Sequence, residues 1–398
     1  MIYLDSASTT EVDSRVVEAM MPYITNYYGN AGTLYDLGTE SARAISKARE
    51  QVAALINAKP EQIIFTSGGT ESNNMVFQGT KNYLVFKNKT HIVTTQIEHD
   101  SVLNAVKKLC DPIYIEQNGA VVQFDSALIP PMINSCISYE TAIQYIESAN
   151  TGLVSIMHTN NETGLVNNNL EEIGKYCSEH GILFHSDCVQ AITCNKIDVN
   201  KLMCDFLSIS SHKIHGVKGV GALYVRNKSV LTPLIYGGSA QEFGLRGGTE
   251  NVAGIVGFGM ACQLMKEQQE HDIAYVTELR NTLYKEICKN LLDHNLSQIV
   301  RINGDLDLNS PGKTINLRFD GVDGETLLIM LNSAGVCATA GSACRSHESE
   351  PSRVLLAMGI SAEDARNSIR FSLSRMNSKS EVEEAAKIIS DCVNYLHK

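Results

Sequence analysis

The chain has 398 residues, a formal net charge of −11 and 43% hydrophobic residues. This apolar content is that of a globular protein, and the length allows two or three domains, so disorder of the whole chain is excluded. An acidic chain offers no basic face to a phosphate backbone, which argues against nucleic acid or an anionic membrane surface as the main partner. Small molecules and proteins remain as ligands.

The 11 cysteines are spaced irregularly along the chain. None forms a Cys-x-x-Cys pair or lies at a zinc-type spacing from a histidine, so we expect no intrinsic metal site. The odd count, together with an N-terminus that lacks the features of a signal peptide, predicts a cytoplasmic chain with reduced thiols. No apolar run reaches the ~18 residues that would predict a membrane helix. Most of the thiols should therefore be small buried side chains.

Short β-rich runs alternate with helix-like runs between about residues 60 and 225. Such alternation predicts a mainly parallel sheet that is covered by helices on both faces and binds ligands at the carboxyl ends of its strands. The expected strands lie at 63–65, 91–95, 153–157, 182–185, 206–209 and 221–225.

The pattern changes after about residue 262, where a long helical run extends to about 295. The strands and helices expected beyond it predict a smaller α+β domain, which the N-terminal segment should join. We expect a large domain at 15–260 and a small domain formed by 1–14 and 261–398. The later elements are expected near 314–319, 324–334, 368–373 and 380–396.

A glycine turn, with Gly68 and Gly69 followed by Thr70, lies between an expected strand and an expected helix. Glycines let the backbone approach an anion closely, and helical N–H groups with Ser and Thr hydroxyls would bind a phosphate. The alternative is an ordinary capped helix N-terminus. The turn is not a Walker loop, because no Gly-Lys-Ser/Thr follows.

Polar residues also follow two of the expected strands. Asp187 comes directly after one strand, and Ser210, His212 and Lys213 come after the next. Taken singly, such an Asp is usually a helix cap and such a Lys a surface charge. Together with a phosphate-binding turn, they are the groups that a protein supplies to pyridoxal phosphate: a carboxylate for the ring nitrogen and an amine for an imine.

At these residues the chain resembles the cysteine desulfurases of the class V aminotransferase family, in the branch that serves nitrogen fixation and iron–sulfur-cluster assembly. The resemblance implies a fold-type I pyridoxal phosphate transferase, with a mainly parallel seven-stranded sheet in the large domain and a smaller α+β domain. It extends nearly from end to end, through motifs at 3–10, 65–73, 98–99, 158–164, 187–190, 210–213, 246–251, 340–344, 350–352 and 368–372.

The resemblance implies three catalytic residues. Lys213 would hold pyridoxal phosphate as an imine and then act as the base at the substrate Cα. His99 would stack on the cofactor ring and shuttle a proton. Cys344, in a loop at about 337–350, would accept the substrate sulfur as a persulfide, with Arg345 and His347 favouring its thiolate. Cys344 would touch a metal cluster only transiently, on a scaffold partner.

The resemblance also implies contacts to the cofactor and the substrate. Asp187 would pair with the ring nitrogen, and Gln190 would donate to the phenolic oxygen. Arg370 would pair with the substrate carboxylate, helped by Asn161 and Asn30. The implied cofactor-binding set is Gly69, Thr70, Asn161, Asp187, Gln190, Ser210, His212, Lys213 and, from the second subunit of a homodimer, Thr249.

The implied reaction converts L-cysteine to L-alanine and passes sulfur to Cys344, for delivery to an iron–sulfur scaffold or another thiolation acceptor. A selenocysteine lyase or aminotransferase of the same fold, or a sulfur-relay docking protein, remains as an alternative. Two segments depart from the family pattern. Ala31-Gly32-Thr33 replaces the usual Pro-Ser-Ser after Asn30, and the turn at 237–242 is one residue longer.

Overall fold

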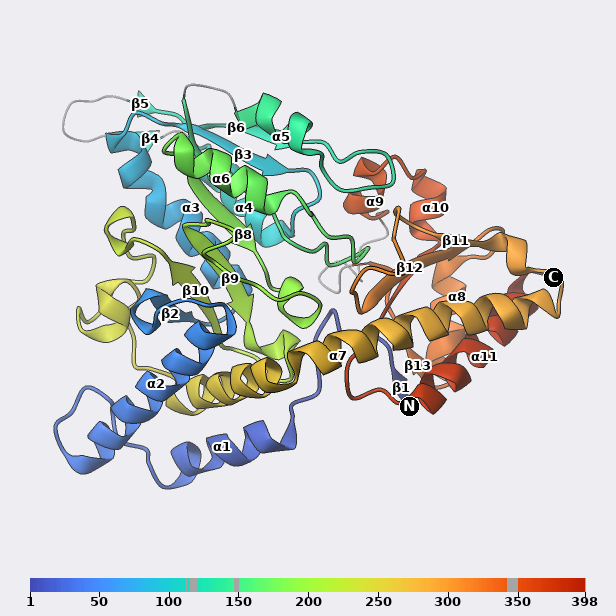
Figure 1. Ribbon diagram of the computed structural model, residues 1–398, viewed down its shortest axis with the longest axis horizontal. Coiled ribbons are helices and arrows are strands. Elements are labelled where there is room, and N and C mark those ends of the chain that lie inside the picture. Colours follow the sequence, from blue (N-terminus) through green and yellow to red (C-terminus); the bar gives the residue numbers. More distant parts are fainter. Residues whose placement is uncertain (112, 115–120, 147–149, 342–349, 398) are drawn as a thin grey trace.

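The computed structural model describes residues 1–111, 113–114, 121–146, 150–341 and 350–397. Figure 1 shows two lobes, a larger one around a central sheet and a smaller one that contains the C-terminus. The long helix α7 runs along both lobes.

A seven-stranded sheet forms the centre of the larger lobe within the described part of the chain. Its strand order is β2-β10-β9-β8-β7-β3-β6, and β10 alone runs antiparallel to its neighbours. The mainly parallel sheet expected from the sequence is confirmed. The strands are β2 (Ile63–Thr66), β3 (His91–Thr95), β6 (Asp125–Ile129), β7 (Thr151–Ser155), β8 (Leu183–Asp187), β9 (Phe206–Ser210) and β10 (Gly221–Val225).

Helices cover both faces of this sheet. Successive side chains of a strand point to opposite faces, so Ile63 and Phe65 pack into one hydrophobic core and Ile64 into the other. The first core contains residues of α2 (Asp36–Leu55), α5 (Tyr139–Ile146), α6 (Leu170–Glu179) and α7 (Val252–Leu292). The second contains residues of α3 (Gly69–Phe86) and α4 (Asp100–Leu109).

The smaller lobe is built on the antiparallel sheet β11-β12-β14 (Figure 1). Its strands are β11 (Val300–Ile302), β12 (Thr314–Phe319) and β14 (Ser368–Ser372). The N-terminal strand β1 (Ile2–Tyr3) pairs in parallel with β13 (Val336–Cys337), which contains Cys337. The lobe's helices are α8 (Gly324–Ser333), α9 (Arg353–Ala357), α10 (Ala362–Arg366) and α11 (Lys379–Leu396).

Helix α7 is 41 residues long and packs into both lobes. Its first half contributes Phe258 to the core under the central sheet, and its second half contributes Leu283 to the core of the smaller lobe. The boundary expected at 260/261 therefore falls within a continuous helix. The remaining elements are α1 (Ser14–Thr25), which lies against α7, and the hairpin of β4 (Ile113–Tyr114) and β5 (Val121–Val122).

None of the helices in the described ranges is both long and apolar enough to cross a membrane.

Candidate active site

A cavity of about 190 Å³ opens at the carboxyl ends of β8 and β9, where Asp187 and Ser210 are the last strand residues. The site of an α/β protein is expected at this edge of the sheet. The cavity brings together ten of the residues predicted for the site, namely Gly69, Thr70, His99, Asn161, Asp187, Gln190, Ser210, His212, Lys213 and Arg370.

Lys213 ends a 3-10 turn (Ser211–Lys213) that follows β9 directly. Its Nζ donates to the carbonyl oxygens of Ala7 at 2.6 Å and Ser8 at 2.7 Å. The Nε2 of Gln190 donates to the same Ala7 oxygen at 2.9 Å. The N-terminal segment therefore forms one wall of the cavity, and its carbonyl groups hold the Lys213 amine in place.

A hydrogen-bonded chain holds Asp187 in place. Asn73 Nδ2, on α3, donates to Asp187 Oδ2 and to Ser101 Oγ, both at 2.8 Å. The Oδ1 atom of Asp187 accepts from the backbone N–H of Val189 at 3.0 Å. Both carboxylate oxygens therefore accept hydrogen bonds, which fixes the orientation of the Asp187 carboxylate at the cavity.

His99 is the N-cap residue of α4, and its orientation follows from that position. The Ser101 backbone N–H donates to His99 Nδ1 at 3.1 Å. Because Nδ1 accepts this bond, a neutral His99 ring carries its proton on Nε2. Ser101 Oγ lies 2.7 Å from the same Nδ1, which connects the His99 ring through Ser101 and Asn73 to Asp187.

The glycine turn before α3 brings backbone to the cavity wall. Gly68 has a φ of +150°, a backbone conformation that residues other than glycine rarely adopt. A Cβ atom on Gly69 would lie 2.8 Å from Val189 Cγ2, so only glycine fits there without a shift of its neighbour. The first residues of α3, whose N–H groups have no partners within the helix, therefore lie at the cavity wall with Ser210.

His212 lies beside this turn, and its Nδ1 is 3.1 Å from Thr9 Oγ1. Burial, followed by the charge of Lys213, lowers the pKa of His212 to about 4. The ring is therefore neutral at pH 7 and can donate a hydrogen bond to an anion without adding a charge.

Arg370 reaches the cavity from β14 of the smaller lobe and is only 1% exposed. Its Nη2 donates to Asp5 Oδ1 at 2.8 Å and to Ser8 Oγ at 2.7 Å, and its Nη1 donates to the Asn161 carbonyl at 2.8 Å. The Nε atom has no partner among the described residues. A buried guanidinium with a spare donor is suited to an anionic group such as a carboxylate.

Buried polar atoms without partners test whether pyridoxal phosphate fits this cavity. In the described part of the chain, Asn73 Oδ1, Gln190 Oε1 and Arg370 Nε are buried and have no hydrogen-bond partner. All three residues line the cavity that also holds the Lys213 amine and the glycine turn. Such atoms require a polar ligand, so the residues fit the cofactor and a carboxylate-bearing substrate.

Glu98 lies beneath the site and is fully buried. Its Oε1 accepts from Thr95 Oγ1 and from the Met157 backbone N–H, both at 2.8 Å. Burial raises the pKa of this carboxyl to about 8, so Glu98 is protonated at neutral pH.

Three of the predicted residues are not placed in the cavity. Cys344 lies outside the described residues. Thr249 and Asn30 are exposed and do not line the cavity, and Asn30 Oδ1 accepts from the Gly32 backbone N–H at 2.9 Å. The structure adds Asn73, Ser101 and Ser8 to the site. The sequence gives Asn73 and Ser101 a weak signal, as polar residues in the first two turns of helices that follow expected strands.

Comparisons with known proteins agree along the whole chain. The model of the Aminotransferase class-V family matches residues 2–384. A cysteine desulfurase of Nostoc sp. is 41% identical over 397 residues, which cover 100% of this chain and 94% of that protein. The cysteine desulfurase IscS of Rickettsia felis is 42% identical over 400 residues, which cover 100% of this chain and 92% of that protein.

Solved structures are similar as well. A NifS-like protein superimposes with a TM-score of 0.85 at 32% identity, covering 99% of this chain and 100% of that chain. The structure of SspA in complex with cysteine superimposes with a TM-score of 0.76 at 33% identity, covering 95% of this chain and 100% of that chain.

Proposed function

The chain belongs to the aminotransferase class-V family, and we propose that it is a pyridoxal phosphate-dependent cysteine desulfurase. It converts L-cysteine to L-alanine and transfers the sulfur to Cys344. One observation carries the proposal: Lys213, Asp187 and Arg370, from three different strands or the turns that follow them, line one cavity. Buried polar atoms of this cavity lack hydrogen-bond partners among the described residues. The relatives named as cysteine desulfurases cover the same full length of chain.

Each residue of the cavity has a distinct task. Pyridoxal phosphate, when bound, withdraws electrons from the substrate Cα. Lys213 attaches the cofactor and moves the Cα proton, and Asp187 keeps a proton on the ring nitrogen. Gly69, Thr70, Ser210 and His212 bind the phosphate. Gln190 and Asn161 contact the ring, and His99 covers one of its faces.

Arg370 orients the substrate by binding its carboxylate. Sulfur then passes from L-cysteine to the Cys344 thiol, which becomes a persulfide while L-alanine leaves. Substrate and products contain the same atoms, because cysteine is alanine plus one sulfur, and no outside oxidant is required. An acceptor protein, such as an iron–sulfur scaffold, takes the persulfide sulfur.

We further propose a homodimer in which Thr249 completes the phosphate site of the partner subunit. Thr249 is exposed in the single chain, as a residue that acts in the partner must be. Large apolar side chains near α1 and α2 and near the turn at 237–242 are exposed too, which supports the proposal of a subunit interface there. They include Ile24, Tyr28, Leu34, Tyr35, Tyr236 and Phe243.

The division into domains at 15–260 and at 1–14 with 261–398 is likewise proposed, with α7 continuous between them. A cytoplasmic location is proposed from the thiols. The ten cysteines in the described ranges are all free, and a reducing compartment keeps thiols in that state.

Two measurements test this function. Protein reconstituted with pyridoxal phosphate should show a visible absorption band that Lys213→Ala lacks and Lys218→Ala, an exposed neighbour, retains. After L-cysteine is added, mass spectrometry should find one extra sulfur on the peptide that contains Cys344. A visible band in Lys213→Ala would refute the cofactor site. Alanine release that persists in Cys344→Ala would favour a lyase instead.

A further inference from the structure

A second cavity, of about 20 Å³, lies behind Lys213. Lys213 lines both this cavity and the active-site cavity, so the two are separated by the lysine itself. A space of this volume accommodates one atom-sized ligand, such as a water molecule or a monatomic ion.

The unusual residue in this cavity is Lys313, which directly precedes β12. It is only 3% exposed, and its Nζ has no hydrogen-bond partner anywhere in the described ranges. A buried ammonium without a partner is costly, because it loses its hydration and gains nothing in exchange. A ligand that supplies the missing partner would remove this cost.

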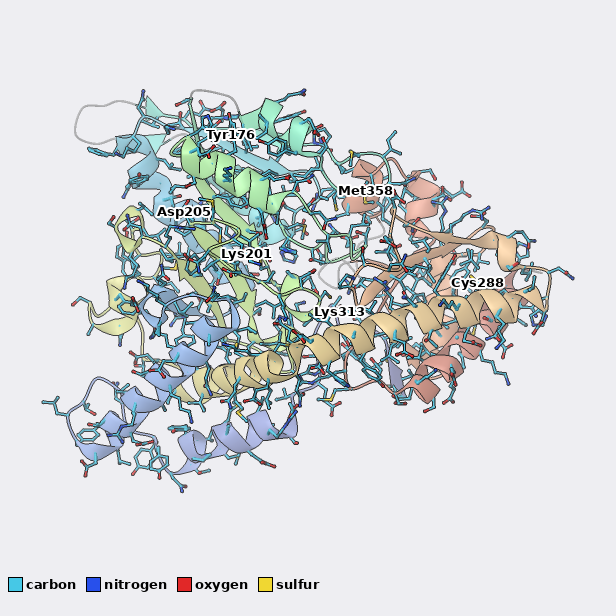
Figure 2. The ribbon with its side chains drawn as sticks, in the orientation of Figure 1. Tyr176, Lys201, Asp205, Cys288, Lys313 and Met358 are labelled. Carbon is cyan, nitrogen blue, oxygen red and sulfur yellow. The ribbon has the colours of Figure 1, made fainter. Side chains whose placement is uncertain are left out.

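Backbone contacts keep Lys313 in place. Its carbonyl accepts from the Leu373 backbone N–H at 2.9 Å, which ties it to the end of β14. The N–H of the preceding residue, Gly312, donates to Thr277 Oγ1 on α7 at 3.1 Å. Figure 2 shows Lys313 beside the middle of α7, between the two lobes. The side chain is therefore buried between the two lobes.

The other charges around the cavity are already paired. Arg375 donates to Asp272 Oδ2 at 3.2 Å and to Asp13 Oδ2 at 2.8 Å, and Arg15 also binds Asp13. The carboxylates therefore have cations of their own, and neither pairs with Lys313. His215 adds no charge at neutral pH, because burial lowers its pKa to about 4.

Groups farther from the cavity do not change this balance of charge around Lys313. Asp5 and Arg370, which also act on Lys313 electrostatically, form an ion pair with each other at 2.8 Å. The Cys194 thiol, the remaining group that acts on Lys313, favours its charged form. Burial lowers the pKa of Lys313 to about 8, so most of the population is charged at pH 7. The cavity wall thus has an uncompensated positive charge.

We propose that this cavity binds a monovalent inorganic anion of the chloride class, with Lys313 Nζ as its ligand. A water molecule would accept a hydrogen bond from Lys313 but would leave its charge uncompensated. A halide does both and is small enough for the space. The site lies where the 3-10 turn of Lys213, α7 and the edge of the smaller lobe meet, so its occupation stabilises the junction of the two lobes behind the catalytic lysine.

A crystallographic experiment on the cofactor-loaded wild-type protein tests the site directly. Crystals are grown or soaked in sodium bromide, and anomalous difference maps are collected at the bromine edge. We expect a bromide peak in contact with Lys313 Nζ. A water molecule or an empty cavity in the presence of bromide would overturn the proposal.

A solution experiment tests it without crystals. The Tm of the cofactor-loaded protein is measured as chloride replaces gluconate at constant ionic strength. We expect a rise in Tm that saturates with chloride, is lost in Lys313→Met and persists in Lys387→Met, which removes an exposed lysine on α11. A wild-type Tm that does not respond, or an equal response in Lys313→Met, contradicts the site. If Lys313→Met does not fold, the bromide map decides.

Discussion

Arg370 Nη2 and Asp5 Oδ1 lie 2.8 Å apart, although 365 positions separate the two residues in the sequence. The pair brings the N-terminal segment against β14 and orients the guanidinium before any substrate arrives. Ser8 Oγ, which donates to the same Asp5 oxygen at 2.9 Å, completes this support. The N-terminal segment therefore positions both Arg370 and Lys213, because its Ala7 and Ser8 carbonyls accept hydrogen bonds from the Lys213 amine.

Replacing Asp5 by Asn should weaken substrate binding more than catalysis. The charge-assisted bond that orients Arg370 is lost, so KM for L-cysteine should rise about tenfold, or about 1.4 kcal/mol, with kcat nearly unchanged. Steady-state kinetics measure both constants. The visible cofactor band should be unaffected, and Asp111→Asn, an exposed substitution, should behave as wild type. An unchanged KM would show that Asp5 does not support Arg370.

Replacing Asn73 by Ala should weaken cofactor binding. Asn73 supplies a hydrogen bond to Asp187 and connects it to Ser101 and His99. Losing one buried hydrogen bond to a charged group should raise the dissociation constant for pyridoxal phosphate about tenfold. Fluorescence or absorbance titration of the cofactor-free protein measures it. The control is Asn82→Ala, on the exposed side of α3. Equal affinity of both variants would contradict this role.

Replacing Glu98 by Gln should make stability less dependent on pH. The folded Glu98 has a pKa of about 8 instead of the ordinary 4.5, so between these values the folded state binds a proton that the unfolded state has lost. Stability should therefore fall as pH rises through this range, and the loss is complete above the folded pKa. Gln keeps the bonds to Thr95 and Met157 without titrating.

The advantage of Glu98→Gln over wild type should thus be small at pH 5 and reach roughly 4 kcal/mol at pH 9. Denaturant unfolding across this pH range measures it. Glu384→Gln, an exposed control on α11, should show no such trend. A Glu98→Gln advantage that stays constant with pH would mean that the carboxyl is not protonated in the folded state.

Thr249 offers a test of the proposed dimer. If Thr249 acts in the partner's site, mixing inactive Lys213→Ala chains with Thr249→Ala chains should restore activity, because each mixed dimer contains one intact site. Co-expression of the two differently tagged chains, followed by tandem purification, isolates the mixed dimer. Its activity should be about half that of wild type. Activity no greater than that of the two parents would place Thr249 in its own subunit's site or outside any site.

The sequence predicts the strands that are buried on both faces of the sheet. β7, β8 and β9 are apolar runs bounded by polar turns, and each lies within a residue or two of its predicted position. β6 at the edge of the sheet gives no such run, because the first residues of Asp125–Ile129 are mostly exposed. No strand is predicted at this position from the sequence.

Helix α7 begins ten residues before the predicted start. Gly254, Gly257 and Gly259 weaken its helical pattern, since glycine is a poor helix former. Packing explains them: a Cβ on Gly259 would lie 2.6 Å from Ala48 Cα on α2, and one on Gly257 would meet Met20 of α1. Close approach of the helices outweighs local propensity here, and a single sequence does not reveal such contacts.

In the site too, some features are predictable from the local sequence and others depend on the folded structure. Asp187, Ser210 and Lys213 are predictable because each ends or follows an apolar strand. The contacts that orient the site residues are not predictable, because Asn73 meets Asp187, and Asp5 meets Arg370, only after segments far apart in the sequence fold together. Orientation of the reactive groups is thus a tertiary property, whereas their identity is local.

The release of L-alanine from L-cysteine is the most direct test of the proposed function. Protein reconstituted with pyridoxal phosphate is incubated with L-cysteine and a thiol reductant, and alanine and sulfide are quantified together. We expect equal amounts of both from the wild type over many turnovers and neither from Lys213→Ala. A wild-type protein that binds the cofactor but forms no alanine from L-cysteine would contradict the assignment.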